Sequence, residues 1–148
     1  LLTETRRLAE HGARLTILGR RDRLSNGMRE LIARAEAETA NGTVLDLRIA
    51  IDYSARDEIA RAARALVERG APITREAIDA ALGTAPSLDL VIRTGRERRL
   101  SDFLLWESAY AELHFTDVMW PDFTAAHLER AVADFHSRTR RFGALAAS

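Results

Sequence analysis

The sequence contains no cysteine and no lysine, and each absence narrows the chemistry that the chain can perform. Without cysteine it has no disulfide, no thiolate metal site and no cysteine nucleophile. All 22 basic residues are arginine and are balanced by 22 acidic residues, so no excess charge indicates a nucleic-acid binder. No apolar run approaches the roughly 20 residues that cross a bilayer, and no signal peptide is recognised. We therefore expect a cytoplasmic globular protein in which any anion site is local.

Hydrophobic periodicity predicts short strands that alternate with amphipathic helices. The length of 148 residues fits a single domain, residues 1–148, with one core. Helices are expected at residues 1–11, 24–40, 54–68, 74–82, 101–111 and 124–141, and strands at 14–19, 44–52, 88–93 and 113–116. Strands separated by helices predict an α/β fold, a parallel sheet with helices on both faces.

The residues that follow the third expected strand are the most informative for function, because ligands of parallel sheets bind beyond the carboxyl ends of strands. Between Arg93 and Arg99 four of seven residues are arginine, and Ser101 follows. Guanidinium groups bind phosphate oxygens through forked, charge-assisted hydrogen bonds, and a helix N-terminus beginning near Ser101 would add backbone N–H donors. The pattern favours a diphosphate site. An exposed loop with solvated arginines fits the same residues, and both interpretations remain open at this point.

Residues 93–106 read RTGRERRLSDFLLW, which is the most specific motif of the chain. This block resembles R-T-[SG]-G-E-x-R-[LI]-S-N-F-L-L-W of the undecaprenyl diphosphate synthases, the cis-prenyltransferase family. The likeness extends over most of the chain, through residues 52–59, 109–113, 120–123 and 140–143. The resemblance implies a truncated form of the undecaprenyl diphosphate synthase-like fold.

The resemblance also implies roles for individual residues. It assigns Arg93, Arg99 and Ser101 to the diphosphate of isopentenyl diphosphate, and Glu112 to a Mg²⁺ ion, for which oxygen ligands are suited. Arg141 and Gly143 match an Arg-x-Gly element that in the family reaches a partner subunit's active site, although a glycine there is also an ordinary helix cap. The expected partners are an allylic diphosphate in the full enzyme and a second subunit, as homodimer or partner subunit. Peripheral membrane contact is compatible with this, and nucleic acid is not expected.

Five positions depart from the family pattern. Asp52 stands for an Asn, Ser54 and Ala55 for a Gly-Gly pair, and Asp102 for the Asn of the block. Arg96 stands for the second glycine of the phosphate loop and adds bulk and charge beside the diphosphate site. The D-G-N-G-R segment of the family, which binds the allylic diphosphate and supplies the catalytic Asp, does not occur in the sequence.

We therefore expect the chain to correspond to the C-terminal part of a cis-prenyltransferase domain and to be inactive alone, with no catalytic residue assigned. Whether the chain is itself an enzyme stays open. The expected function is to supply the isopentenyl-diphosphate-binding half of a cis-prenyltransferase. The alternatives are a shortened non-catalytic partner subunit or decayed paralogue, and a diphosphate-binding α/β domain of other function.

Overall fold

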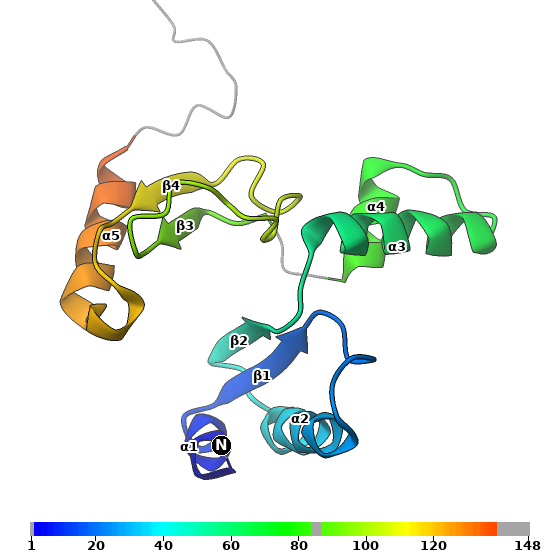
Figure 1. Ribbon diagram of the computed structural model, residues 1–148, viewed down its shortest axis with the longest axis horizontal. Helices are drawn as coiled ribbons and strands as arrows, with labels where there is room; N and C mark the ends of the chain where they lie inside the picture. The colour runs from blue at the N-terminus through cyan, green and yellow to red at the C-terminus, as the bar shows by residue number, and fades with distance from the viewer. Residues whose placement is uncertain (1, 84–86, 139–148) are drawn as a thin grey trace, which may run out of the picture. The chain divides into compact units, whose positions relative to one another are not determined.

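The computed structural model describes residues 2–83 and 87–138 of the chain, which divides into two compact units, residues 1–54 and 55–148 (Figure 1). The helices are α1 (Leu2–Glu10), α2 (Asn26–Thr39), α3 (Ala55–Glu68), α4 (Arg75–Leu82) and α5 (Ala125–Ser137). The strands are β1 (Ala13–Leu18), β2 (Leu45–Ala50), β3 (Leu90–Arg93) and β4 (Glu112–Phe115), and a 3-10 turn, η1, spans Trp120–Asp122.

The first unit is a parallel strand pair with two helices. β1 and β2 run parallel, in a register that sets Leu15 opposite Leu47. Helices α1 and α2 contact each other and β1, so they lie against the same face of the sheet (Figure 1). Leu15 and Ile17 point to that face because strand side chains alternate, and they form a buried core with Ile32 and Ala35 of α2.

The edge of β1 that does not face β2 is closed by side chains of α2. The backbone N–H of Leu15 donates to Thr39 Oγ1 at 3.0 Å, and that of Ile17 donates to Glu36 Oε1 at 2.9 Å. Arg21 also donates to Glu36 Oε1, at 2.6 Å. Strand N–H groups that would otherwise lack an acceptor are therefore satisfied, and β1 is protected against further strand pairing.

The closure by Glu36 makes the stability of the first unit depend on pH. Burial on its own raises the pKa of Glu36, but the hydrogen bonds from Arg21 and from the Ile17 N–H outweigh it and lower the pKa. A lowered pKa means that the carboxylate stabilises fully above the ordinary glutamate value of about 4.3 and loses this contribution as the pH falls through and below that value. Between pH 6 and pH 3 we expect the free energy of unfolding of Glu36→Gln to fall by about 0.5 kcal/mol less than that of the wild type, as measured by urea unfolding. An equal fall in the two proteins would contradict the stabilising role of the Glu36 carboxylate.

The second unit begins with two packed helices. Ala62 and Leu66 of α3 form a buried core with Ile78 and Leu82 of α4, against which Trp106 packs. The Trp106 Nε1–H also donates to Asp79 Oδ1 at 2.5 Å. Helix α4 begins at an N-cap, Thr74, whose side chain accepts from Ala77 N–H, and ends at a left-handed glycine.

The rest of the second unit is a second parallel pair with one helix. β3 and β4 pair from Leu90 opposite Glu112 to Arg93 opposite Phe115. Helix α5 contacts β4, and His114 Nδ1 lies 3.2 Å from Asp134 Oδ2. Because side chains alternate along a strand, Glu112 and His114 face α5, whereas Leu113 and Phe115 face away.

The α/β class with parallel strands and helices is confirmed. β1 pairs with β2 in the first unit, and β3 pairs with β4 in the second. The prediction of one domain stays a prediction. The helix predicted to reach residue 141 ends at Ser137, because Arg138 is extended and bonds to Glu112 and Asp134.

The helix predicted for residues 101–111 is wrong, since this stretch forms a series of turns. Ser101, Asp102 and Leu104 have positive φ angles of 52°, 62° and 46°, which a right-handed helix does not accommodate. The helix N-terminus expected to donate to a diphosphate is therefore absent from this position.

Within the described ranges, none of the helices combines the length and the apolar character that crossing a membrane requires.

Candidate functional site

The loop that follows β3 is fixed to the end of β4 by backbone hydrogen bonds. The Thr116 N–H donates to the Arg93 carbonyl at 2.9 Å, and the Arg96 N–H donates to the Thr116 carbonyl at 3.3 Å. The Gly95 N–H donates to the Val118 carbonyl at 2.8 Å. The loop thus leaves the carboxyl edge of the sheet in a defined conformation, at the place where parallel sheets bind ligands.

Left-handed backbone conformations are concentrated in this loop and the turns after it. Between Gly95 and Leu104, four residues other than glycine have positive φ: Arg96, Ser101, Asp102 and Leu104. Such conformations cost roughly 1–2 kcal/mol for a residue with a Cβ, and they gather where function requires a particular backbone path. We call residues 93–104 the arginine loop, and the strain supports a functional role for its backbone path.

Arg93 and Ser101 lie together in the arginine loop. Arg93 Nη2 lies 3.4 Å from Ser101 Oγ. The Arg93 Nε is buried and has no hydrogen-bond partner among residues 2–83 and 87–138. A buried donor without an acceptor costs about 1–3 kcal/mol, and a phosphate oxygen is the acceptor that a guanidinium binds most strongly. The pair therefore fits an anion.

Arg99 is not brought to this pair. Its Nε donates to Glu97 Oε2 at 2.7 Å, and its side chain is exposed. The hydrogen bond from Arg99 lowers the pKa of Glu97 and in turn raises the pKa of Arg99, so both groups are charged at neutral pH. The structure therefore unites two of the three predicted diphosphate ligands and leaves the third in a surface ion pair.

The carboxylate of Asp102 is bound to the first turn of α3. Its Oδ1 accepts from the Arg56 N–H at 3.1 Å and lies 3.5 Å from Arg56 Nε. Its carbonyl accepts from the Ala55 N–H at 2.9 Å. Asp102 thereby satisfies donors at the first turn of α3, where a carboxylate is favourable. This departure from the family pattern has a structural role.

Glu112 lies at the other end of the β3–β4 sheet. It pairs with Leu90, three residues before Arg93, which corresponds to about 10 Å along a strand. Its Oε2 lies 2.9 Å from Arg138 Nη1. A Mg²⁺ shared between Glu112 and an anion on Arg93 does not fit this arrangement. The role of Glu112 as a metal ligand stays a prediction.

Arg138 links Glu112 to a second carboxylate. Arg138 Nη2 lies 2.6 Å from Asp134 Oδ2, which also contacts His114. The hydrogen bonds from His114 and then Arg138 lower the pKa of Asp134. In the part of the chain that the structure describes, no three acidic or histidine side chains gather as a metal-binding group. Arg141 and Gly143 lie outside the described residues.

Asp52, which departs from the family pattern, follows β2 at the carboxyl edge of the first unit's sheet. Asp52 has a positive φ of 50°, and its carboxylate lies 3.5 Å from Arg23 Nη1. Its carbonyl accepts from the Arg20 N–H at 3.1 Å, beside Gly19. These contacts fix the carboxyl edge of β1–β2 and assign no ligand to it.

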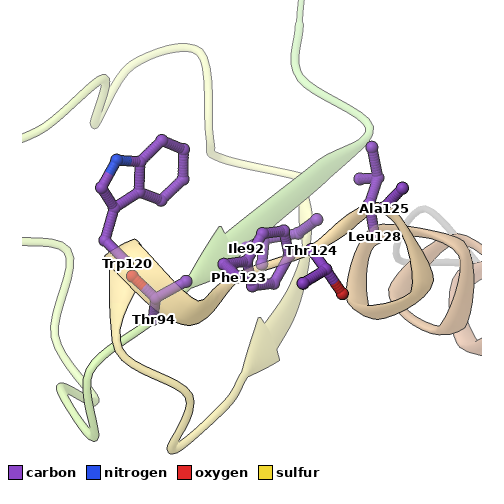
Figure 2. Close-up of a pocket in the computed structure, with 7 residues that line it drawn as sticks. All are labelled: Ile92, Thr94, Trp120, Phe123, Thr124, Ala125 and Leu128. Atoms are coloured by element: carbon purple, nitrogen blue, oxygen red, sulfur yellow. The ribbon is translucent and has the colours of Figure 1, made fainter.

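An apolar cavity of about 350 Å³ beside the arginine loop was not predicted from the sequence. It is lined by residues of β3 and the following loop and by residues of η1, of α5 and of the two positions between them, namely Ile92, Thr94, Trp120, Phe123, Thr124, Ala125 and Leu128 (Figure 2). The rings of Trp120 and Phe123 stack with centroids 6.1 Å apart. The sequence marks residues 120–123 only as part of the family likeness, and no local pattern there indicates a cavity.

Comparison with known proteins identifies relatives along almost the whole chain. Residues 1–143 match the model of the prenyltransferase family described as undecaprenyl diphosphate synthase. Isoprenyl transferase 1 of Bradyrhizobium diazoefficiens is 55% identical over 150 residues, which cover 99% of this chain and 61% of that protein. The chain thus spans about three fifths of the length of the curated relatives that it matches.

Two solved structures are also similar. A probable undecaprenyl diphosphate synthase from Campylobacter jejuni has a TM-score of 0.90 at 35% identity, over 96% of this chain and 69% of that one. Lavandulyl diphosphate synthase from Lavandula x intermedia, in complex with dimethylallyl diphosphate, has a TM-score of 0.89 at 30% identity, over 96% and 66%. No comparison supports the expectation that the chain is inactive alone. The match over residues 1–143 shows that the chain belongs to the undecaprenyl diphosphate synthase family of prenyltransferases.

Proposed function

We propose that this chain binds the diphosphate of isopentenyl diphosphate through Arg93 and Ser101, with Arg99 as a third donor, and that the whole protein is a cis-prenyltransferase. The observation that carries the proposal is the 3.4 Å approach of Arg93 Nη2 to Ser101 Oγ at the carboxyl edge of β3. The buried Arg93 Nε adds a donor without an acceptor in the described chain. Arg93 Nη2, Arg93 Nε and the Ser101 hydroxyl are three donors that together carry one positive charge. Such a group suits a diphosphate better than a neutral ligand.

Arg99 requires one rearrangement in this proposal. Its partner, Glu97, is a surface carboxylate, and exposed ion pairs contribute only about 0–1 kcal/mol. A diphosphate carries more charge than one carboxylate and competes for the guanidinium. Arg99 therefore turns from Glu97 to the ligand when the ligand binds.

The reaction proposed for the whole protein joins two isoprenoid diphosphates. The C–O bond of an allylic diphosphate breaks and its diphosphate leaves with the bonding electrons. The double bond of isopentenyl diphosphate forms the new C–C bond, and a proton lost from the isopentenyl unit leaves a cis double bond. Arg93 and Ser101 hold isopentenyl diphosphate in position for the reaction, which lowers the entropic part of the barrier. The dimethylallyl diphosphate bound to lavandulyl diphosphate synthase supports an allylic co-substrate.

Three further properties belong to this proposal. Membership of the family suggests that the whole protein depends on a metal ion, and magnesium is the proposed one. A homodimer is proposed because large apolar side chains are exposed in the second unit, among them Leu113, Phe115 and Trp120. A cytoplasmic location remains a prediction.

The proposal predicts that Arg93→Gln weakens isopentenyl diphosphate binding by roughly thirtyfold, because a charge-assisted hydrogen bond to phosphate is worth about 1.5–3 kcal/mol. Ser101→Ala is expected to weaken it about fivefold, as a neutral donor contributes less. Titration calorimetry with the purified chain measures both affinities.

The exposed Arg34 on α2 provides the matched control. Arg34→Gln removes the same charge in the other unit and is expected to leave the affinity unchanged. If Arg93→Gln binds as tightly as Arg34→Gln, while both melt like the wild type, the assigned site is wrong.

A further inference from the structure

Arg96 is a charged residue held in an unfavourable backbone conformation. Its φ is 65°, and the preceding Gly95 is also left-handed, at 76°. Glycine adopts this region without penalty, whereas arginine does not. A strained arginine at a ligand-binding edge calls for a functional reason.

The backbone holds Arg96 close to Arg93. Both residues bond to Thr116, Arg93 through its carbonyl and Arg96 through its N–H. The position of Arg96 relative to the Arg93–Ser101 pair is therefore set by the end of β4 and not by a free loop. Arg98, two residues further on, has no backbone hydrogen bond among those that fix the loop.

The guanidinium of Arg96 is available. It is exposed, and within residues 2–83 and 87–138 it forms no hydrogen bond or ion pair. Residues 93–101 contain four arginines and one glutamate, Glu97, which is paired with Arg99. The local positive charge is therefore uncompensated at Arg96, next to a site that fits an anion.

We propose that Arg96 contacts the second phosphate of the ligand and makes the site selective for diphosphates over monophosphates. The inference rests on the proposed function, since it assumes that Arg93 and Ser101 hold the first phosphate. Arg93 and Ser101 alone suffice for a single phosphate group, and Arg99 has to leave Glu97 before it can contribute. A second phosphate group therefore gains from a donor that is unpaired and fixed close by. Arg96 meets both conditions.

The test compares inorganic diphosphate with inorganic phosphate in titration calorimetry, on the purified 148-residue chain at about 0.15 M salt, where long-range charge effects are screened. Arg96→Gln and Arg96→Gly are each expected to weaken diphosphate binding about tenfold and to change phosphate binding less than about twofold. Arg98→Gln, which removes a neighbouring charge, is expected to change neither affinity by more than about twofold. Arg96→Gly should melt no lower than the wild type, because glycine relieves the strain.

Three outcomes overturn the inference: unchanged or tighter diphosphate binding in both Arg96 variants, equal losses for phosphate and diphosphate, or an equal loss in Arg98→Gln. Tighter binding would mean that Arg96 obstructs the site. Arg93→Gln separates the two proposals. If it loses both ligands while the Arg96 variants lose neither, the proposed function stands and the role of Arg96 falls. If the wild type binds neither ligand, both fall.

Discussion

Gly19→Ala is expected to destabilise the first unit by about 4 kcal/mol, a large part of the 5–15 kcal/mol that stabilises a typical domain. Gly19 has a φ of 106°, a region that is essentially restricted to glycine. A Cβ at this position would meet the Ile51 carbonyl oxygen at 2.2 Å and the Asp52 carbonyl oxygen at 3.0 Å.

The cost is high because the obstructing atoms belong to the backbone. The Ile51 N–H donates to the Leu18 carbonyl at 2.9 Å, and the Arg20 N–H donates to the Asp52 carbonyl at 3.1 Å. The two neighbours of Gly19 are therefore both bound to the segment of residues 51–52. Making room for a methyl group requires breaking these hydrogen bonds. An obstructing side chain could have moved away by a change of rotamer, but backbone atoms cannot. The change should therefore separate the carboxyl ends of β1 and β2.

Gly27→Ala is the matched control for this substitution. Gly27 lies near the start of α2, and a Cβ there would meet no atom within 4 Å. Alanine favours the helix, so this variant should be more stable by about 0.5 kcal/mol. Denaturant unfolding of the three proteins measures both effects, and equal stability of Gly19→Ala and Gly27→Ala would show that the close approach of the two segments is not maintained.

The strands and most helices could be predicted because their signals are local. β1 alternates apolar and polar residues, and α4 is preceded by Thr74 and followed by Gly83, which are ordinary capping residues. The turns after Ser101 could not be predicted. Apolar and aromatic residues with helical spacing occupy them, and no glycine indicates that Ser101, Asp102 and Leu104 adopt positive φ.

The candidate site divides in the same way. Arg93 could be placed at the end of a strand from its neighbours, and its association with Ser101 followed from the family motif. The contacts of Glu112 with Arg138, and of Asp102 with the first turn of α3, join residues 26 and 46 positions apart. No local pattern specifies such contacts, because they depend on how the turns between the elements bring the residues together. The unpartnered Arg93 Nε was also beyond prediction.

Thr39→Val is expected to cost about 2–3 kcal/mol although the two side chains have nearly the same shape. Thr39 is 1% exposed, and its Oγ1 accepts from the Leu15 N–H at 3.0 Å while donating to the Ala35 carbonyl at 2.9 Å. Valine removes the acceptor and leaves a strand N–H buried without a partner, which costs the desolvation of that group. The shared shape excludes a cavity as the cause.

Thr39→Ser separates the hydroxyl from the methyl group. Serine keeps the acceptor and loses one methyl, so it should cost only about 1 kcal/mol. Hydrogen exchange gives a second measurement, since the Leu15 amide should exchange faster in Thr39→Val and remain protected in Thr39→Ser. If valine proves as stable as serine and the Leu15 amide stays protected, another acceptor has replaced the hydroxyl, and the closed edge of β1 does not depend on Thr39. If the expected order holds, the Thr39 hydroxyl is required beside Glu36 to keep the free edge of β1 closed to a further strand.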